Sequence, residues 1–160
     1  MSLLNTDKIS SLTGIDPSEE LIKLAEKRID DSMPNIDLVI SKAEEMQFND
    51  NTFDTVLMTY TLCTVEDVHA SLSEIKRVLK PEGQLLFCEH GLAPEEKTAE
   101  WQNRINYIWP HISGGCNLNK DIPHLIGKAG FNISNMEQMY LPKTPKILGY
   151  NYWGTAIKAD

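Results

Sequence analysis

Asp16, Ala43, Glu44, Tyr60 and His90 stand where expected β-strands of this sequence end. Their types suit ligand binding, because a carboxylate accepts hydrogen bonds, a small residue admits a flat ring, and a histidine exchanges protons near neutral pH. Open α/β sheets bind their ligands outside the carboxyl ends of the strands. The pattern therefore predicts a ligand site along one edge of a sheet.

Two roles are open to Asp16. An acidic residue between a strand and a helix commonly holds ribose hydroxyls, since its carboxylate accepts both hydrogens. Asp16 also suits the N-cap of the helix that follows, with Pro17 at the first helical position and Glu19 as a capping-box acid. Local sequence favours neither role over the other.

The remaining strand-end residues leave similar alternatives. Ala43 and Glu44 suit contacts with a flat base and its amino group, or they belong to an ordinary solvated loop. Tyr60 is either a ligand contact or a packed aromatic side chain. His90 is either a general base or a hydrogen-bonding partner of a neighbouring loop. No Ser-His-Asp arrangement or pair of catalytic carboxylates is recognised in the sequence.

The later part of the chain carries a second group of candidates. Trp101, Trp109, His111 and Cys116 either cover the strand ends as a lid over an apolar acceptor or form a small core of their own.

The three cysteines are Cys63, Cys88 and Cys116, and they form no C-x-x-C pair. This spacing indicates neither a structural zinc site nor a disulfide framework. We therefore expect reduced, mostly buried thiols and no metal site.

The periodicity of the apolar residues predicts the elements that position these side chains. The expected strands cover residues 9–15, 36–41, 53–59, 84–89, 131–140 and 150–158. The expected helices follow residue 16 and cover residues 65–79, 94–108 and 121–129, with a turn at 80–83 and a loop at 110–119. This order predicts a doubly wound α/β sheet in which 53–59 is a central parallel strand buried on both faces, and the last two strands form a hairpin.

Length and composition fit one domain over residues 1–160. The formal net charge of -8 and the lack of any Lys/Arg run argue against nucleic-acid binding. No apolar run is long enough to span a bilayer, and no signal-peptide pattern opens the chain. These features predict a cytoplasmic protein with no membrane partner.

Three segments resemble motifs of class I S-adenosylmethionine-dependent methyltransferases with a type-11 domain. They are 14–18 (GIDPS), 42–54 (KAEEMQFNDNTFD) and 74–83 (EIKRVLKPEG), in the order and spacing of that family. Four shorter segments resemble methyltransferase-like proteins that include alkyl-thiol methyltransferases. These are 62–65 (LCTV), 87–90 (FCEH), 109–112 (WPHI) and 115–118 (GCNL).

The resemblance implies a Rossmann-like α/β sheet of strand order 3-2-1-4-5-7-6, mostly parallel with a C-terminal antiparallel hairpin. It implies S-adenosylmethionine as the cofactor, held by Asp16, Pro17, Ala43, Glu44 and Tyr60. The methyl acceptor would then be a small apolar molecule, with a thiol as one candidate. His90 remains the candidate catalytic base.

The sequence departs from the family pattern at three places. Lys42 stands where the family has the acid that bonds adenine, and Glu82 replaces a glycine of the turn. No counterpart of the first strand and its E-x-G-x-G-x-G loop is found, and the residues before Ile9 are too few to supply it. We therefore expect an incomplete, N-terminally truncated domain. Its sheet would rearrange by pairing the strands that end at Asp16 and Thr59, or it would be completed in a homodimer or other homo-oligomer.

Two further function classes share features with this sequence. The main alternative is a non-catalytic oligomeric α/β module derived from the methyltransferase fold. A nicotinamide-dependent oxidoreductase shares the type of sheet, but no G-x-G-x-x-G motif follows a strand and the closing hairpin is not typical of that class.

Overall fold

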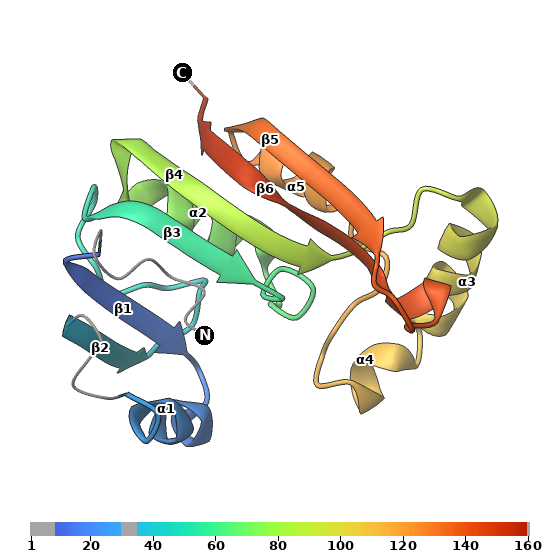
Figure 1. Ribbon diagram of the computed structural model, residues 1–160, viewed down its shortest axis with the longest axis horizontal. Coiled ribbons are helices and arrows are strands. Elements are labelled where there is room, and N and C mark those ends of the chain that lie inside the picture. The colour runs from blue at the N-terminus through green and yellow to red at the C-terminus, as the bar shows by residue number, and fades with distance from the viewer. Residues whose placement is uncertain (1–8, 30–34, 160) are drawn as a thin grey trace. The chain divides into compact units, whose positions relative to one another are not determined.

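The computed structural model describes residues 9–29 and 35–159 of the 160-residue chain. The chain divides into two compact units, Met1–Gln47 and Phe48–Asp160, which we call the N-terminal and C-terminal units. Each unit has a β-sheet of its own (Figure 1).

The N-terminal unit is a parallel β-α-β crossover. Strand β1 (Ser11–Asp16) pairs in parallel with β2 (Asn35–Ile40), with Asp16 opposite Ile40 at the carboxyl ends. Helix α1 (Glu19–Glu26) connects the two strands and packs on both, with Ile22 as its buried residue. The expected strands 9–15 and 36–41 are therefore present, displaced by one or two residues.

Of the two roles left open for Asp16, the capping of this helix is wrong. The N-cap is Ser18, whose side-chain oxygen accepts a hydrogen bond from the main-chain N–H of Leu21 at 3.3 Å. Asp16 still belongs to β1, because its pairing with Ile40 continues the strand to that residue. Pro17 consequently lies before the helix and not at its first position.

The C-terminal unit contains a four-stranded sheet in the order β3-β4-β6-β5. Its strands are β3 (Phe53–Thr59), β4 (Leu79–His90), β5 (Phe131–Tyr140) and β6 (Tyr150–Lys158). Strand β3 is parallel to β4, whereas β6 is antiparallel to both β4 and β5. Only β6 therefore runs against the other strands of this sheet. The expected hairpin is confirmed, and the order corresponds to 4-5-7-6 of the family sheet, as β2-β1 corresponds to 3-2.

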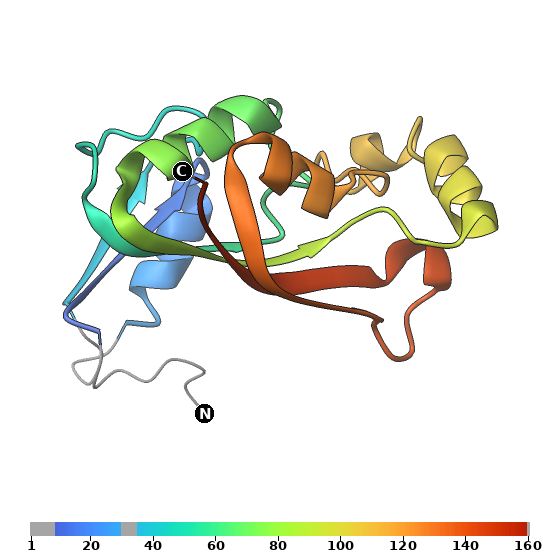
Figure 2. The ribbon, with the colours of Figure 1, turned by 90° about the horizontal axis from the view of Figure 1, so that it is seen from above.

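Two helices cover one face of this sheet (Figure 2). They are α2 (Val68–Val78) and α5 (Ile122–Lys128), and each begins at an aspartate whose carboxylate accepts a main-chain N–H, Asp67 and Asp121. The core lies between these helices and the sheet and consists of aliphatic and aromatic side chains, among them Leu72, Ile75, Val78, Leu85, Phe87, Ile122, Ile126 and Ala156. The remaining elements are α3 (Glu96–Ile105), α4 (Trp109–Ile112) and the 3-10 turn η2 (Lys146–Leu148).

Some predicted boundaries were wrong. The expected helix 65–79 is shorter, because Asp67 caps it. The expected turn 80–83 lies within β4, where the register to β3 shifts between Phe53 and Thr55. The helix expected over 94–108 ends at Ile105, and the expected loop 110–119 includes part of α4.

Strand β3 is an edge strand of its sheet and not a central one. Leu57, which the apolar pattern placed in a core, is 56% exposed. Within residues 9–29 and 35–159, β1 and β3 belong to separate sheets, so the expected direct pairing of their strands is not found. The described ranges contain no further strand that could pair with both β1 and β3. The expectation that the residues before Ile9 are too few to supply the missing first strand concerns residues 1–8, which lie outside those ranges.

None of the helices in the described part of the chain has the length and apolar character that crossing a membrane requires.

Candidate functional site

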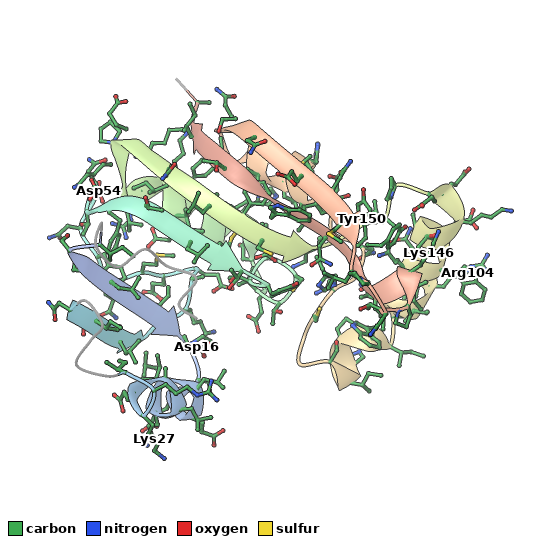
Figure 3. The ribbon with its side chains drawn as sticks, viewed as in Figure 1. Asp16, Lys27, Asp54, Arg104, Lys146 and Tyr150 are labelled. Carbon is green, nitrogen blue, oxygen red and sulfur yellow. The ribbon has the colours of Figure 1, made fainter. Side chains whose placement is uncertain are left out.

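Asp16 ends β1 with a half-exposed carboxylate (Figure 3). One carboxylate oxygen, Oδ1, accepts the main-chain N–H of Ser18 at 2.8 Å, and the carbonyl oxygen of Asp16 accepts the N–H of Ser41 at 3.2 Å. The first of these bonds fixes the direction of the side chain. A carboxylate offers about four lone-pair sites, so one such bond leaves capacity for ligand hydroxyls.

Ala43 and Glu44 lie in the turn that follows β2. The turn is closed by a hydrogen bond from the N–H of Glu45 to the carbonyl oxygen of Lys42 at 3.3 Å, and both Ala43 and Glu44 are half-buried. Because β1 and β2 are parallel, their carboxyl ends meet at one edge. The N-terminal unit thus brings this turn to the same edge as Asp16, as the sequence predicted.

Tyr60 follows β3 directly and has a left-handed backbone, with φ of 50°. Such a conformation is uncommon for a non-glycine residue and is held only where surrounding bonds enforce it. Here the main-chain N–H of Tyr60 donates to the carbonyl oxygen of Cys88 at 2.9 Å, and its hydroxyl donates to Oδ1 of Asn151 at 2.8 Å. Its ring centroid lies 6.3 Å from that of His90, so the C-terminal unit brings these two predicted residues together.

Glu89 is a fully buried carboxyl group that the sequence analysis did not single out. Its Oε1 accepts the N–H of Thr61 at 2.7 Å, while Oε2 has no partner that meets hydrogen-bond geometry within the described residues. Burial raises the pKa of Glu89 to about 7, and the main-chain amides after β3 partly oppose that rise. The sequence signal that could have identified Glu89 is an acidic residue directly after the apolar run of a strand.

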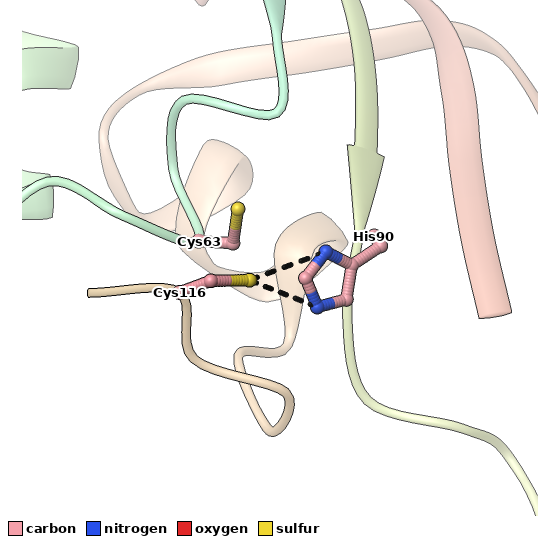
Figure 4. A group of neighbouring side chains, drawn as sticks. All are labelled: Cys63, His90 and Cys116. Carbon is pink, nitrogen blue, oxygen red and sulfur yellow. Dashed lines mark hydrogen bonds between the residues drawn. The ribbon is translucent and has the colours of Figure 1, made fainter. Parts of the chain in front are cut away.

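Cys63, His90 and Cys116 form a compact cluster in the C-terminal unit (Figure 4). Cys63 lies in the turn after β3, His90 is the last residue of β4, and Cys116 lies in the loop after α4. The Sγ of Cys116 lies 3.5 Å from Nε2 and 3.8 Å from Nδ1 of His90. One ligand-type atom from each of the three residues lies within 4.8 Å of the others.

The two thiols of this cluster differ in acidity. The pKa of Cys63 rises to about 12, chiefly because its S–H bonds to Cys116 and then because it is buried. The pKa of Cys116 is lowered, chiefly by that same bond from Cys63, and further by the indole N–H of Trp109. All three cysteines of the chain are free thiols, but the expectation that they are mostly buried is wrong, because Cys63 is buried whereas Cys88 and Cys116 are half-buried.

Hydrogen bonds onto main-chain carbonyl oxygens hold the two loops of the cluster against each other. Asn117 donates to the carbonyl oxygen of Cys63 from both its main-chain N–H, at 2.7 Å, and its side-chain Nδ2, at 3.1 Å. Lys120 donates from Nζ to the carbonyl oxygens of Leu62 and Val65 at 2.7 and 3.2 Å. The sequence analysis missed both residues, because nothing local shows that a side chain will bond a loop more than fifty residues away.

The group expected as a lid does not act as one unit. Trp101 is exposed and stacks with Arg104, whose guanidinium carbon lies 5.5 Å from the ring centroid, and His111 is also exposed. Only Cys116 joins the cluster, with Trp109 beside it. Whether any of these residues covers an acceptor stays a prediction.

Comparison with known proteins identifies the family. The model of the methyltransferase domain family matches residues 1–87. The thiol S-methyltransferase TMT1B of Rattus norvegicus is 32% identical over 147 residues, which are 86% of this chain and 60% of that protein. The thiol S-methyltransferase TMT1A of Homo sapiens is 29% identical over 152 residues, covering 92% of this chain and 62% of that protein. The chain thus spans about three fifths of the length of these relatives.

Solved structures agree on the fold. A putative methyltransferase from Bacillus halodurans superposes with a TM-score of 0.77 at 17% identity, over 94% of this chain and 84% of that one. A SAM-dependent methyltransferase from Methanosarcina mazei superposes with a TM-score of 0.70 at 21% identity, over 93% and 82% of the two chains. The chain belongs to the methyltransferase domain family, and its fold is that of the class I S-adenosylmethionine-dependent enzymes.

Proposed function

We propose that this chain takes part in the transfer of a methyl group from S-adenosylmethionine to a small-molecule thiol. The observation that carries the proposal is the shared edge of the N-terminal unit, where Asp16 and the turn with Ala43 and Glu44 follow adjacent parallel strands. The thiol acceptor is inferred from the relatives named as thiol S-methyltransferases.

The residues at the strand ends are assigned to different parts of the cofactor. Asp16 accepts the two ribose hydroxyls, for which its carboxylate keeps free lone pairs after bonding Ser18. Pro17 fixes the chain direction between β1 and α1, since its ring restricts φ. Ala43 and Glu44 contact the adenine. For Tyr60, which follows β3 in the C-terminal unit, a cofactor contact stays a prediction from the family resemblance.

The reaction needs little covalent chemistry from the protein. S-adenosylmethionine would supply the methyl group, whose bond to the sulfonium sulfur would break as its bond to the acceptor sulfur formed, and the thiol proton would pass to a base or to water. S-adenosylhomocysteine and the methyl thioether are the products. The protein contributes positioning and exclusion of water. His90 is the proposed base, and its ring nitrogens already face a thiol, that of Cys116.

Turnover with matched acceptors tests this proposal. The chain is incubated with isotopically labelled S-adenosylmethionine and either 2-mercaptoethanol or ethylene glycol, which differ in replacing S–H by O–H. Methylation of the thiol alone supports the assignment, while equal or no transfer to both contradicts it. With His90→Gln, loss of turnover at unchanged cofactor affinity supports the base, and retained turnover rules it out.

The non-catalytic oligomeric module remains the second candidate, and β3 favours it, because this strand has a single sheet neighbour, β4, among the described residues. An unpaired strand edge is a template for pairing with another chain. Sedimentation equilibrium separates a monomer from a dimer. A monomer over the whole concentration range would contradict the proposal of an oligomeric module.

A further inference from the structure

We propose that Cys63, His90 and Cys116 bind one thiophilic divalent cation, for which Zn²⁺ is the best match. The three side chains come from the turn after β3, the end of β4 and the loop after α4, and they converge on one point (Figure 4). Two sulfurs and one imidazole nitrogen are the ligand set that borderline-soft cations prefer over oxygen-binding Mg²⁺ or Ca²⁺.

The distances fit a tetrahedral zinc centre. Zn–S bonds of about 2.3 Å and Zn–N bonds of about 2.0–2.1 Å, at tetrahedral angles, place a sulfur about 3.8 Å from a second sulfur and about 3.6 Å from a nitrogen. The Sγ of Cys116 lies 3.5 Å from Nε2 of His90. All three ligand atoms lie within 4.8 Å of one another, so a contraction of about an ångström at most closes the set around a cation.

The imidazole needs only a small change of orientation. The Sγ of Cys116 is almost equally distant from both ring nitrogens of His90, so it faces the ring edge between them. A modest rotation of the ring aims one nitrogen at the point shared by the two sulfurs. His90 is nearly fully buried, and the imidazole therefore has few competing partners from water.

The surroundings prepare the site for positive charge. Glu89 is fully buried and directly precedes His90 in β4, and its Oε2 lacks a hydrogen-bond partner within the described residues. Buried carboxylates are normally paired or near a metal. The buried indole Nε1–H of Trp109 also lies beside Cys116, where a thiolate sulfur would accept it.

The positions of the ligands are held before any cation arrives. Asn117, which follows Cys116 directly, bonds the carbonyl oxygen of Cys63 twice, and Lys120 bonds the carbonyl oxygen of Leu62. These bonds tie the two cysteine-bearing loops together. Ligands that are already held in place lower the entropy cost of metal binding, and outer-shell hydrogen bonds provide this advantage.

Three protein ligands leave one tetrahedral position for an exchangeable ligand, as in open zinc sites. A coordinated imidazole nitrogen has no lone pair for a proton. The metal site and the general-base role of His90 are therefore alternatives, and metal binding decides between them.

Cobalt substitution and zinc competition test the proposal on the full chain, purified with a phosphine reductant and stripped of metal. Tetrahedral Co²⁺ with thiolate ligands gives intense visible bands and sulfur-to-metal charge transfer in the near ultraviolet. We expect one equivalent of Co²⁺ per chain with both signatures, displaced by one equivalent of Zn²⁺.

Single variants identify the ligands. Cys63→Ser, Cys116→Ser and His90→Ala should each weaken Zn²⁺ binding by more than the roughly 10- to 100-fold that losing an outer-shell partner costs. Cys88→Ser is the matched control, because Cys88 is a partly buried thiol of β4 outside the cluster, and it should bind as the original chain does. Circular dichroism confirms that each variant is folded.

Two results would overturn the proposal without relying on any variant. One is that the original, reduced chain takes up less than about a tenth of an equivalent of Zn²⁺ when Zn²⁺ is supplied at a concentration at which an ordinary structural site would be full. The other is an octahedral Co²⁺ spectrum without charge transfer. Equal binding by the original chain and all three cluster variants would also overturn it.

Discussion

Gln102 offers a sharp test of how the C-terminal unit holds the segment after His90. Its side chain is fully buried in α3 and makes three hydrogen bonds. Its Oε1 accepts the N–H of Ala93 at 2.8 Å, and its Nε2 donates to the carbonyl oxygens of Gly91 and Ile147 at 3.1 and 3.2 Å. Leucine has a similar volume but no polar atoms, so Gln102→Leu leaves all three partners unpaired.

The expected loss follows from those three bonds. Each contributes about 0.5–1.5 kcal/mol, and a buried partner left without a bond costs about 1–3 kcal/mol. The added apolar burial of leucine offsets part of this. We expect Gln102→Leu to lower the free energy of unfolding by about 3–5 kcal/mol, which is large for a single substitution.

Gln102→Glu separates hydrogen bonding from volume. The introduced carboxylate still accepts from Ala93 but cannot donate to either carbonyl, and burial opposes its charge. This variant should therefore be more stable at pH 5 than at pH 8, because the protonated form regains one donor. Gln138→Leu on exposed β5 is the control, with an expected change of less than about 0.5 kcal/mol.

Urea unfolding followed by tryptophan fluorescence measures the free energy of unfolding of the C-terminal unit. The three tryptophans, at positions 101, 109 and 153, all lie in the C-terminal unit, so the signal reports that unit. If Gln102→Leu unfolds within 1 kcal/mol of the original chain, the three-bond description of Gln102 is incorrect.

Two further predictions use the same unfolding assay. In Gly91→Ala the new Cβ would lie 2.4 Å from the main-chain oxygen of Lys120, which should lower the free energy of unfolding by about 1–3 kcal/mol. In Gly127→Ala the new Cβ meets nothing within 4 Å, so this variant should be as stable as the original chain or more stable. Equal effects of the two substitutions would contradict the close contact of Gly91 with Lys120. Burial raises the pKa of Tyr152, whose hydroxyl donates to Leu92 at 2.6 Å, from 10.0 to about 12. Because the folded state then keeps a proton that the unfolded chain loses, stability should fall by about 2 kcal/mol as the pH rises from 10 to 12. Tyr152→Phe should reduce that fall, and an unchanged pH profile would contradict the assignment.

The sequence was most informative where local pattern determines structure. Strands β3, β5 and β6 have the predicted bounds, because β-prone residues between flanking turn residues define them without tertiary help. The sequence did not identify the N-cap of α1, since Asp16 and Ser18 are both suitable N-cap residues. Only the pairing of Asp16 with Ile40 in the sheet decides between them.

The candidate site was predicted in part. Asp16, Ala43 and Glu44 share an edge because parallel strands require it, and Tyr60 and His90 are neighbours for the same reason. The cluster of Cys63 and Cys116 with His90 was not predictable from spacing. It depends on bonds from Asn117 and Lys120 to a distant loop, and no local pattern encodes such bonds.

The central claim is that the edge at Asp16 binds the ribose of S-adenosylmethionine. The control is Asp37→Ala, which removes an exposed carboxylate from β2 of the same unit.

Isothermal titration of S-adenosylmethionine into the original chain, Asp16→Ala and Asp37→Ala tests the claim most directly. Loss of a charge-assisted hydrogen bond costs about 1.5–3 kcal/mol, so Asp16→Ala should bind roughly 10- to 150-fold more weakly, and Asp37→Ala should bind as the original chain does. Undetectable binding to the original chain at millimolar ligand, or equal affinity for all three proteins, would contradict the claim.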